Sequence, residues 1–113
     1  MQHKKLWYKF EKLARDFLEN QGFQILSINF TIRWWEIDII AKKWDVISFV
    51  EVKGSSFWND FQDYITQSKI KALKRTAEHW IYNFDDESIK EYRFDLILIE
   101  KDKVVDFIQW FLD

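Results

Sequence analysis

Two apolar segments separated by only three residues constrain the fold more than any other feature of this sequence. Residues 36–42 and 46–53 are rich in Ile, Val and Phe, a composition typical of strands. The three-residue break at 43–45 suits a hairpin turn. Because both segments are apolar at most positions, we interpret them as neighbouring central strands of a sheet that other elements must cover.

The rest of the chain supplies those covering elements. Apolar residues at helical spacing predict one helix over residues 5–21, with Gly22 in the left-handed cap position, and a second helix over 65–84. Further strands are predicted at 23–33, 92–100 and 103–108. The order α-β-β-β-α-β-β therefore predicts a single α/β domain over residues 1–113, with a central mixed five-stranded sheet flanked by helices.

Composition excludes several classes of protein. A chain of 113 residues with 48% hydrophobic residues is expected to form one folded domain rather than a disordered segment. No apolar run approaches the roughly 20 residues of a membrane span, and no hydrophobic signal segment follows the first residues. The absence of cysteine excludes disulfides, thiolate metal sites and thiol catalysis. We therefore expect a cytoplasmic protein that does not associate with a membrane.

Charged residues in the two central strands are the main anomaly. Strict alternation places Asp38 on one face of its strand, with Ile37 and Ile39 on the other, and it places Glu51 and Lys53 together in the next strand. A buried carboxylate costs several kcal/mol unless it is paired or bound to a metal ion. A short hairpin would bring Asp38, Glu51 and Lys53 to one patch.

The chemistry that suits this patch is metal-assisted phosphodiester hydrolysis. Mg²⁺ prefers oxygen ligands and retains several waters, so two carboxylates can hold it. The ion would polarise a phosphate and activate a water molecule, while Lys53 would position that water or stabilise developing charge. The alternative is a solvated sheet edge that carries only a Glu–Lys ion pair.

The same strings resemble those of a known family. Residues 35–40, Trp-Glu-Ile-Asp-Ile-Ile, and 49–53, Phe-Val-Glu-Val-Lys, resemble the Gly-Glu-Ile-Asp-Leu-Ile and Phe-Val-Glu-Val-Lys signatures of the YraN-like family. These small bacterial proteins are related to Holliday-junction resolvases, within the restriction-endonuclease-like PD-(D/E)XK superfamily. Weaker matches to the family are Phe-Glu-Lys-Leu-Ala at 10–14, Asn-Phe-Thr-Ile-Arg at 29–33, Ser-Lys at 68–69 and Arg-Phe-Asp at 93–95.

The resemblance implies roles for individual residues. Asp38 and Glu51 would be the carboxylate ligands of Mg²⁺ or Mn²⁺, with the backbone carbonyl of Val52 as a further ligand. Lys53 would complete the catalytic set of Asp38, Glu51 and Lys53. Glu11 would reach the metal directly or through water; its alternative is an ordinary exposed helix glutamate.

A second group of residues is implicated in binding nucleic acid. The candidates are Arg33, Ser68 and Lys69, which would contact phosphate. Glu36 shares the face of Asp38 and would either support the site or pair with Arg33. Other cations of the second helix and aromatic residues of the preceding loop could also bind nucleic acid. For the cations, a role in solubility is at least as good an explanation, and for the aromatic residues, packing is. These residues are Lys71, Lys74, Arg75, Phe57, Trp58 and Phe61.

Tryptophan stands at five positions where the family has glycine. These positions are Trp7, Trp34, Trp35, Trp44 and Trp58, in a chain with 7 Trp and 2 Gly. Two explanations are open. Either the tryptophans are genuine and crowd the loops near the site, or UGA codons that the source reads as glycine were translated as tryptophan. The codons would distinguish the two.

These observations favour a Mg²⁺-dependent endonuclease acting on DNA, with branched or damaged DNA as the candidate substrate. Related resolvases act as symmetric dimers, so the resemblance also suggests a homodimer. The alternative is a catalytically inactive nuclease-fold module that binds nucleic acid or a protein partner, since a net charge of −2 is low for a DNA-binding protein. A third possibility is a small α/β protein with a surface salt bridge.

Overall fold

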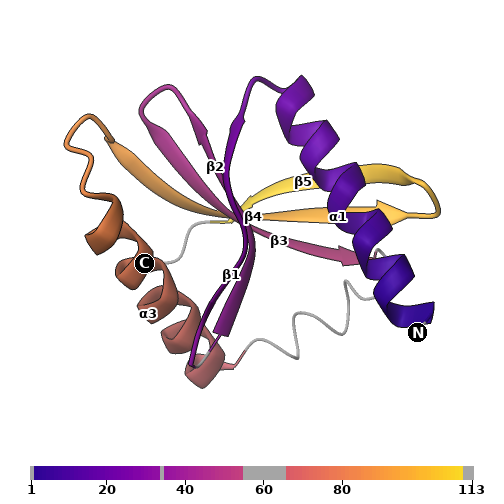
Figure 1. Ribbon diagram of the computed structural model, residues 1–113, viewed down its shortest axis with the longest axis horizontal. Coiled ribbons are helices and arrows are strands. Elements are labelled where there is room, and N and C mark those ends of the chain that lie inside the picture. Colours follow the sequence, from indigo (N-terminus) through magenta and orange to yellow (C-terminus); the bar gives the residue numbers. More distant parts are fainter. Residues whose placement is uncertain (1, 34, 55–65, 111–113) are drawn as a thin grey trace.

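The computed structural model describes residues 2–33, 35–54 and 66–110, and the side chains of 6–33, 35–54 and 66–109. Within these described ranges, two helices and five strands follow the predicted order α-β-β-β-α-β-β (Figure 1). Their bounds are α1 Gln2–Asn20, β1 Gln24–Ile32, β2 Trp35–Lys43, β3 Val46–Gly54, α3 Gln67–Phe84, β4 Glu91–Glu100 and β5 Lys103–Trp110. Within the described residues, no helix is long and apolar enough to cross a membrane.

The five strands form one mixed sheet in the spatial order β1-β2-β3-β4-β5. Neighbouring strands are antiparallel except β3 and β4, which are parallel. A parallel pair needs a crossover connection, and the chain between β3 and β4 contains α3. Figure 1 shows α1 and α3 on opposite sides of the sheet, so each face has its own helical cover. The predicted fold class is confirmed.

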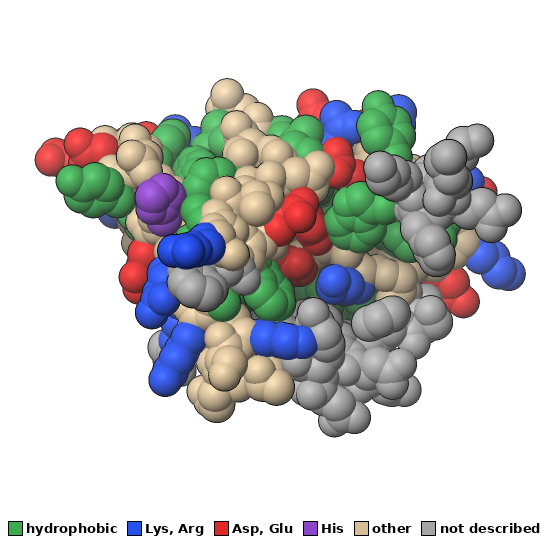
Figure 2. Space-filling model, turned by 60° about the horizontal axis from the view of Figure 1, so that its bottom comes forward, with side chains coloured by type: hydrophobic (Ala, Val, Ile, Leu, Met, Phe, Trp, Pro, Cys, Tyr) green, Lys and Arg blue, Asp and Glu red, His purple; other side chains and the backbone are tan. Residues whose placement is uncertain are grey.

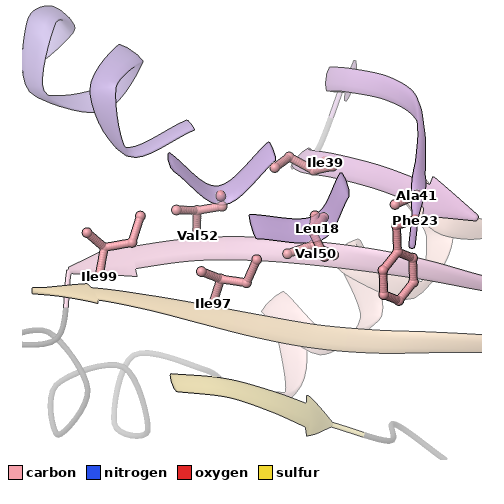
Figure 3. Close-up of a cluster of buried hydrophobic side chains, with 9 residues drawn as sticks. Leu18, Phe23, Ile39, Ala41, Val50, Val52, Ile97 and Ile99 are labelled. Carbon is pink, nitrogen blue, oxygen red and sulfur yellow. The ribbon is translucent and has the colours of Figure 1, made fainter. Parts of the chain in front are cut away.

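The first hydrophobic core lies between α1 and the sheet. Figure 3 shows Val50 and Val52 of β3 beside Ile97 and Ile99 of β4, with Leu18 of α1 among the same cluster. All five side chains are essentially removed from solvent. Burial of this kind contributes roughly 1.5–3 kcal/mol for each large aliphatic side chain, so α1 is held mainly by packing.

The second core lies under α3. Leu73, Ala77 and Trp80 of the helix pack against Ile40 and Phe49 of the sheet. The rings of Phe49 and Trp80 meet edge to face, with centroids 5.8 Å apart. Both central strands are therefore covered on two sides, which explains why their sequences are apolar at most positions.

Left-handed residues mark the ends and turns of several elements. Gly22 has φ 95° after α1, as the sequence predicts for the cap position. Trp44 has φ 55° in the β2–β3 turn and Lys101 has φ 57° in the β4–β5 turn. At the start of α3, the backbone N–H of Lys69 donates to Thr66 Oγ1 over 3.3 Å, which is the arrangement of a helix N-cap.

One detail of the predicted strand faces is wrong. Ile37 was expected on the same face as Ile39 and Ala41, but it packs in the second core, whereas Ile39 and Ala41 belong to the first. The change of face falls between the paired residues Ile28↔Ile39 and Phe30↔Ile37, where Asn29 of β1 takes a left-handed conformation with φ 54°. A left-handed residue interrupts the regular pleat, so alternation does not continue through this point.

Candidate functional site

The site begins where strands β2 and β3 separate. Their ladder ends at the pair Ile39↔Val50, so Asp38 and Glu51, the next residues along, are not paired through their backbones. Instead, Asp38 Oδ2 accepts a hydrogen bond from the backbone N–H of Val52 at 2.8 Å. The carboxylate therefore closes the end of the ladder and is itself fixed in position by the backbone of β3.

Asp38 and Glu51 form a buried pair. Their side chains are only 6% and 7% exposed. Burial raises the pKa of Asp38 from 3.8 to about 6, against the opposing effects of the Val52 N–H, the positive charge of Lys53 and the hydrogen bond with Glu51. Burial, followed by the negative charge of Asp38, raises the pKa of Glu51 well above its ordinary value. Without a cation, the pair therefore holds a proton to a higher pH than two exposed carboxyl groups would.

Lys53 acts on both carboxyl groups. Its positive charge lowers the pKa of Asp38 and that of Glu51. Lys53 is half-buried at the end of β3, two residues beyond Glu51, so the pleat directs both side chains to the same face. The structure thus brings together Asp38, Glu51 and Lys53, the three residues predicted to be catalytic.

Trp35 lies against the pair, which the sequence did not predict. Trp35 Nε1 and Glu51 Oε1 are both buried and have no hydrogen-bond partner among the described residues. The indole is nevertheless near enough to lower the pKa of Glu51. A buried polar atom without a partner costs about 1–3 kcal/mol. Glu51 therefore retains an acceptor oxygen that a bound ligand could use.

Glu11 of α1 is buried and contacts β1. It is 6% exposed, which is unusual for a glutamate on a helix, so the alternative of an ordinary exposed residue is wrong. Asn29 Nδ2 donates to Glu11 Oε2 at 2.8 Å, and the register of β1 and β2 places Asn29 opposite Asp38. Asn29 thus links the helix glutamate to the strand that carries Asp38. Its role was not predicted, although its left-handed backbone is common for Asn.

The donor set suits a hard divalent cation. Two carboxyl groups side by side, one with an unpartnered oxygen, are oxygen ligands of the kind that Mg²⁺ and Mn²⁺ prefer. Over the described ranges, however, no group of three or more His, Cys, Asp or Glu side chains is arranged to hold a metal ion. Asp38 and Glu51 are therefore the fitting ligands in this geometry, while Glu11 is hydrogen bonded to Asn29 of β1.

The remaining candidates lie around this pair. Glu36 is exposed, and its charge raises the pKa of Asp38, which places it near that carboxylate. Arg33 is exposed just beyond β1. Ser68 is exposed and Lys69 is half-buried in the first turn of α3. Phe57, Trp58 and Phe61 lie outside the described residues.

The end of the molecule that holds the β1–β2 hairpin and the start of α3 has a mixed charge. This end lies at the bottom of Figure 1 and is turned forward in Figure 2. Acidic side chains lie near the middle of this face, with Lys and Arg side chains on either side (Figure 2). Such an arrangement suits a phosphate group that meets a cation held by carboxylates.

Asp95 is a buried carboxylate elsewhere in the sheet. Arg93 Nε donates to both carboxylate oxygens of Asp95, at 3.0 and 2.9 Å, so the first and last residues of the Arg-Phe-Asp match form an ion pair. Ser48 Oγ also donates to Asp95 Oδ2, and this contact was not predicted. The available signal was that Ser48 is the polar exception within the apolar segment 46–50.

Comparison with known proteins gives one consistent result. The profile of a family described as "Uncharacterised protein family UPF0102" matches residues 10–99. A UPF0102 protein of Campylobacter fetus is 42% identical over 104 residues, covering 90% of this chain and 88% of the relative. A UPF0102 protein of Rhodopseudomonas palustris is 36% identical over 89 residues, covering 79% of this chain and 68% of the relative. A UPF0102 protein of Vibrio parahaemolyticus is 32% identical over 93 residues, covering 80% of this chain and 77% of the relative.

Proposed function

The chain belongs to the uncharacterised protein family UPF0102, the YraN-like family, and from this premise we propose that it is a metal-dependent endonuclease that hydrolyses phosphodiester bonds in DNA. The family description carries no activity, so the site must support the proposal. The single observation that carries it is the buried pair of Asp38 and Glu51 with the charge of Lys53 acting on both.

Each residue of the site has a distinct task in this proposal. Asp38, held by the Val52 N–H, and Glu51 would bind Mg²⁺ or Mn²⁺, with the Val52 carbonyl and Glu11 as further ligands. The bound ion would supply charge to polarise the phosphate and activate water. Lys53 would orient the attacking water or stabilise negative charge on the phosphate in the transition state. Glu36 would support Asp38 from the exposed side.

DNA would approach from the end of the molecule that Figure 2 brings forward. Arg33, Ser68 and Lys69 would contact backbone phosphates there, which positions the strand but does not read its sequence. Branched or damaged DNA is the proposed substrate, on the resemblance to junction resolvases. For a four-way junction, two strands must be cut, and a homodimer would place one site on each strand.

A cleavage assay tests the proposal. Labelled four-way, flap and single-stranded DNA would be incubated with Mg²⁺, with Mn²⁺ and with a chelator. Glu51→Gln and Lys53→Ala should each reduce the rate by at least about 100-fold, as for loss of a group that stabilises the transition state. Glu19→Gln, an exposed carboxylate on α1, is the matched control and should cleave normally. Cleavage that persists in both site variants would contradict the assignment.

The second candidate is a nuclease-fold module without catalysis. The observation in its favour is that Asp38 and Glu51 are both buried with raised pKa values, while no group of three metal-ligating side chains occurs in the described part of the chain. A shared proton can satisfy such a pair without a metal ion. This candidate predicts DNA or protein binding that is insensitive to the chelator and is never followed by cleavage.

A further inference from the structure

A second pocket lies at the opposite end of the sheet from the carboxylate pair. It has a volume of about 300 Å³, near the lower limit for small-ligand sites. Val46, at the start of β3, lines it, whereas Glu51 lies five residues further along the same strand. At about 3.3 Å per residue, this separation is roughly 16 Å. The pocket is therefore distinct from the proposed catalytic site.

Two cations face this pocket, and they are held in different ways. Lys43 Nζ lies 5.6 Å from the ring centre of Phe23 and 5.3 Å from that of Trp44. Within the described ranges, no carboxylate lies within ion-pair distance of Lys43. Among the described residues, aromatic faces are therefore its partners, and these are weaker partners than a carboxylate or phosphate.

Arg93 is the second cation, and the protein interior fixes its position. Asp95, which is 1% exposed, accepts from Arg93 Nε through both carboxylate oxygens. An arginine has five N–H donors, and these bonds use one of them. Among the described residues, the four donors on the two terminal nitrogens have no hydrogen-bond partner, so they can meet a ligand in the pocket that Arg93 lines. Because Asp95 neutralises Arg93, Lys43 gives this pocket its net positive charge.

The other walls are aromatic and amide groups. Phe23, Trp44 and Phe107 line the pocket, and the rings of Phe23 and Phe107 meet edge to face with their centroids 6.2 Å apart. Figure 3 shows Phe23 beside Ala41 at one end of the first core, so its ring is anchored by packing. Gln21 and Gln109, both exposed, add amides that can donate and accept hydrogen bonds.

We propose that this pocket binds a nucleotide, with the base against the aromatic rings and the phosphate between Lys43 and Arg93. Stacking on aromatic side chains holds bases of any type, and a guanidinium with an ammonium suits a phosphate monoester. The amides would meet the polar edge of the base. The ligand can be a free nucleotide or the phosphorylated end of a strand. The proposal does not depend on the nuclease activity of Asp38 and Glu51.

Calorimetric titration in the presence of a chelator tests this inference, with AMP as the probe. Lys43→Ser should weaken AMP binding about tenfold, which is the usual effect of losing one charge-assisted contact. Lys42→Ser is the matched control. Lys42 is the adjacent residue on the other face of β2, 3.9 Å from Asp86, and its loss should leave AMP binding unchanged. Melting curves would verify that both variants are folded.

Further titrations distinguish a free nucleotide from the end of a strand, and they include the results that would overturn the proposal. A short single strand with a 5′-phosphate that binds more tightly than AMP would assign the pocket to strand ends, while weaker binding would assign it to free nucleotides. Phe107→Leu should weaken both ligands. Adenosine that binds as tightly as AMP, equal losses in the two lysine variants, or no AMP binding to the wild type would each overturn the proposal.

Discussion

Asp38 reaches from β2 across to β3 and accepts the backbone N–H of Val52 at 2.8 Å, immediately beyond the last backbone pair of the two strands. One side chain therefore has two roles. It completes the hydrogen bonding of β3, and it holds a carboxylate beside Glu51 with only 6% of its surface exposed. The first role favours folding, whereas the second opposes it near neutral pH because a buried charge is costly.

Asp38→Asn should stabilise the protein while abolishing cleavage. The amide oxygen can still accept from Val52, but the buried negative charge is removed. Since the pKa of Asp38 is raised from 3.8 to about 6, the expected gain at pH 8 is about 1–3 kcal/mol. Urea unfolding in a chelator measures it. Asp38→Ala is the contrast, because it also removes the acceptor and should gain less or lose stability.

Without a divalent cation, stability should fall as the pH rises from about 4 to above 6. Both carboxyl groups have raised pKa values in the folded protein, that of Asp38 at about 6 and that of Glu51 well above its ordinary value. The folded state therefore binds more protons than the unfolded state, and this contribution is present below the unfolded pKa and lost above the folded one. Unfolding at pH 5 and pH 8 provides the measurement, with the Asp38→Asn, Glu51→Gln double variant showing a much weaker dependence.

Mg²⁺ should reverse this loss if the pair holds the ion. Binding to the folded state alone raises stability by about 2.7 kcal/mol when the ion is at 100 times its dissociation constant. Protons compete for the same oxygens, so the rise in melting temperature should be larger at pH 8 than at pH 5. An equal rise at the two pH values, or one that persists in Glu51→Gln, would argue for a different binding site.

The sequence was sufficient to predict the order of elements and the central hairpin. Two apolar segments with a short break leave few arrangements other than adjacent buried strands. Asp38 and Glu51 then meet because both lie at the same end of the β2–β3 ladder. The face of Ile37 was not predictable, because alternation fails between Ile37 and Ile39, opposite the left-handed Asn29 of the neighbouring strand. Alternation within one strand contains no information about such a distortion.

Contacts between residues far apart in sequence account for the other differences. Asn29 meets Glu11 across 18 positions, and Ser48 meets Asp95 across 47. Neither contact can be predicted from the spacing of its two residues in the sequence. Asn and Ser are also common in turns and on surfaces, so their presence alone does not indicate a buried contact. The approach of Trp35 to Glu51 likewise follows from strand register, which side-chain pattern alone did not specify.

Asn29 should tolerate glycine better than alanine. With φ 54°, alanine would add the strain of a left-handed residue to the loss of the hydrogen bond to Glu11, whereas glycine would lose only the bond. We expect Asn29→Ala to be less stable than Asn29→Gly by about 1 kcal/mol. Equal unfolding free energies for the two variants would contradict the backbone argument. Reduced cleavage by both variants would show that Asn29 also positions Glu11.

Substitution of Trp44 tests whether glycine is more stable than tryptophan at a position where the family has glycine. Trp44 lies in the β2–β3 turn with φ 55° and is 83% exposed, so its ring gains little from packing apart from the contact with Lys43. Trp44→Gly should raise the free energy of unfolding by about 0.5–1 kcal/mol, because glycine adopts positive φ without strain. Trp44→Ala keeps the strain and removes the ring, so it should give no gain.

The codon at position 44 supplies the independent check on this argument. A UGG codon would establish the tryptophan as genuine, and the stabilisation by glycine would then measure a cost that the natural turn carries. A UGA codon, together with that stabilisation, would favour glycine as the natural residue, and Trp35 beside Glu51 would need the same check. Glycine at position 35 would remove the indole from the carboxylate pair and open access to it. Cleavage by Trp35→Gly that exceeds that of the unaltered chain is the expected result, and an unchanged rate would show that the indole does not obstruct the site.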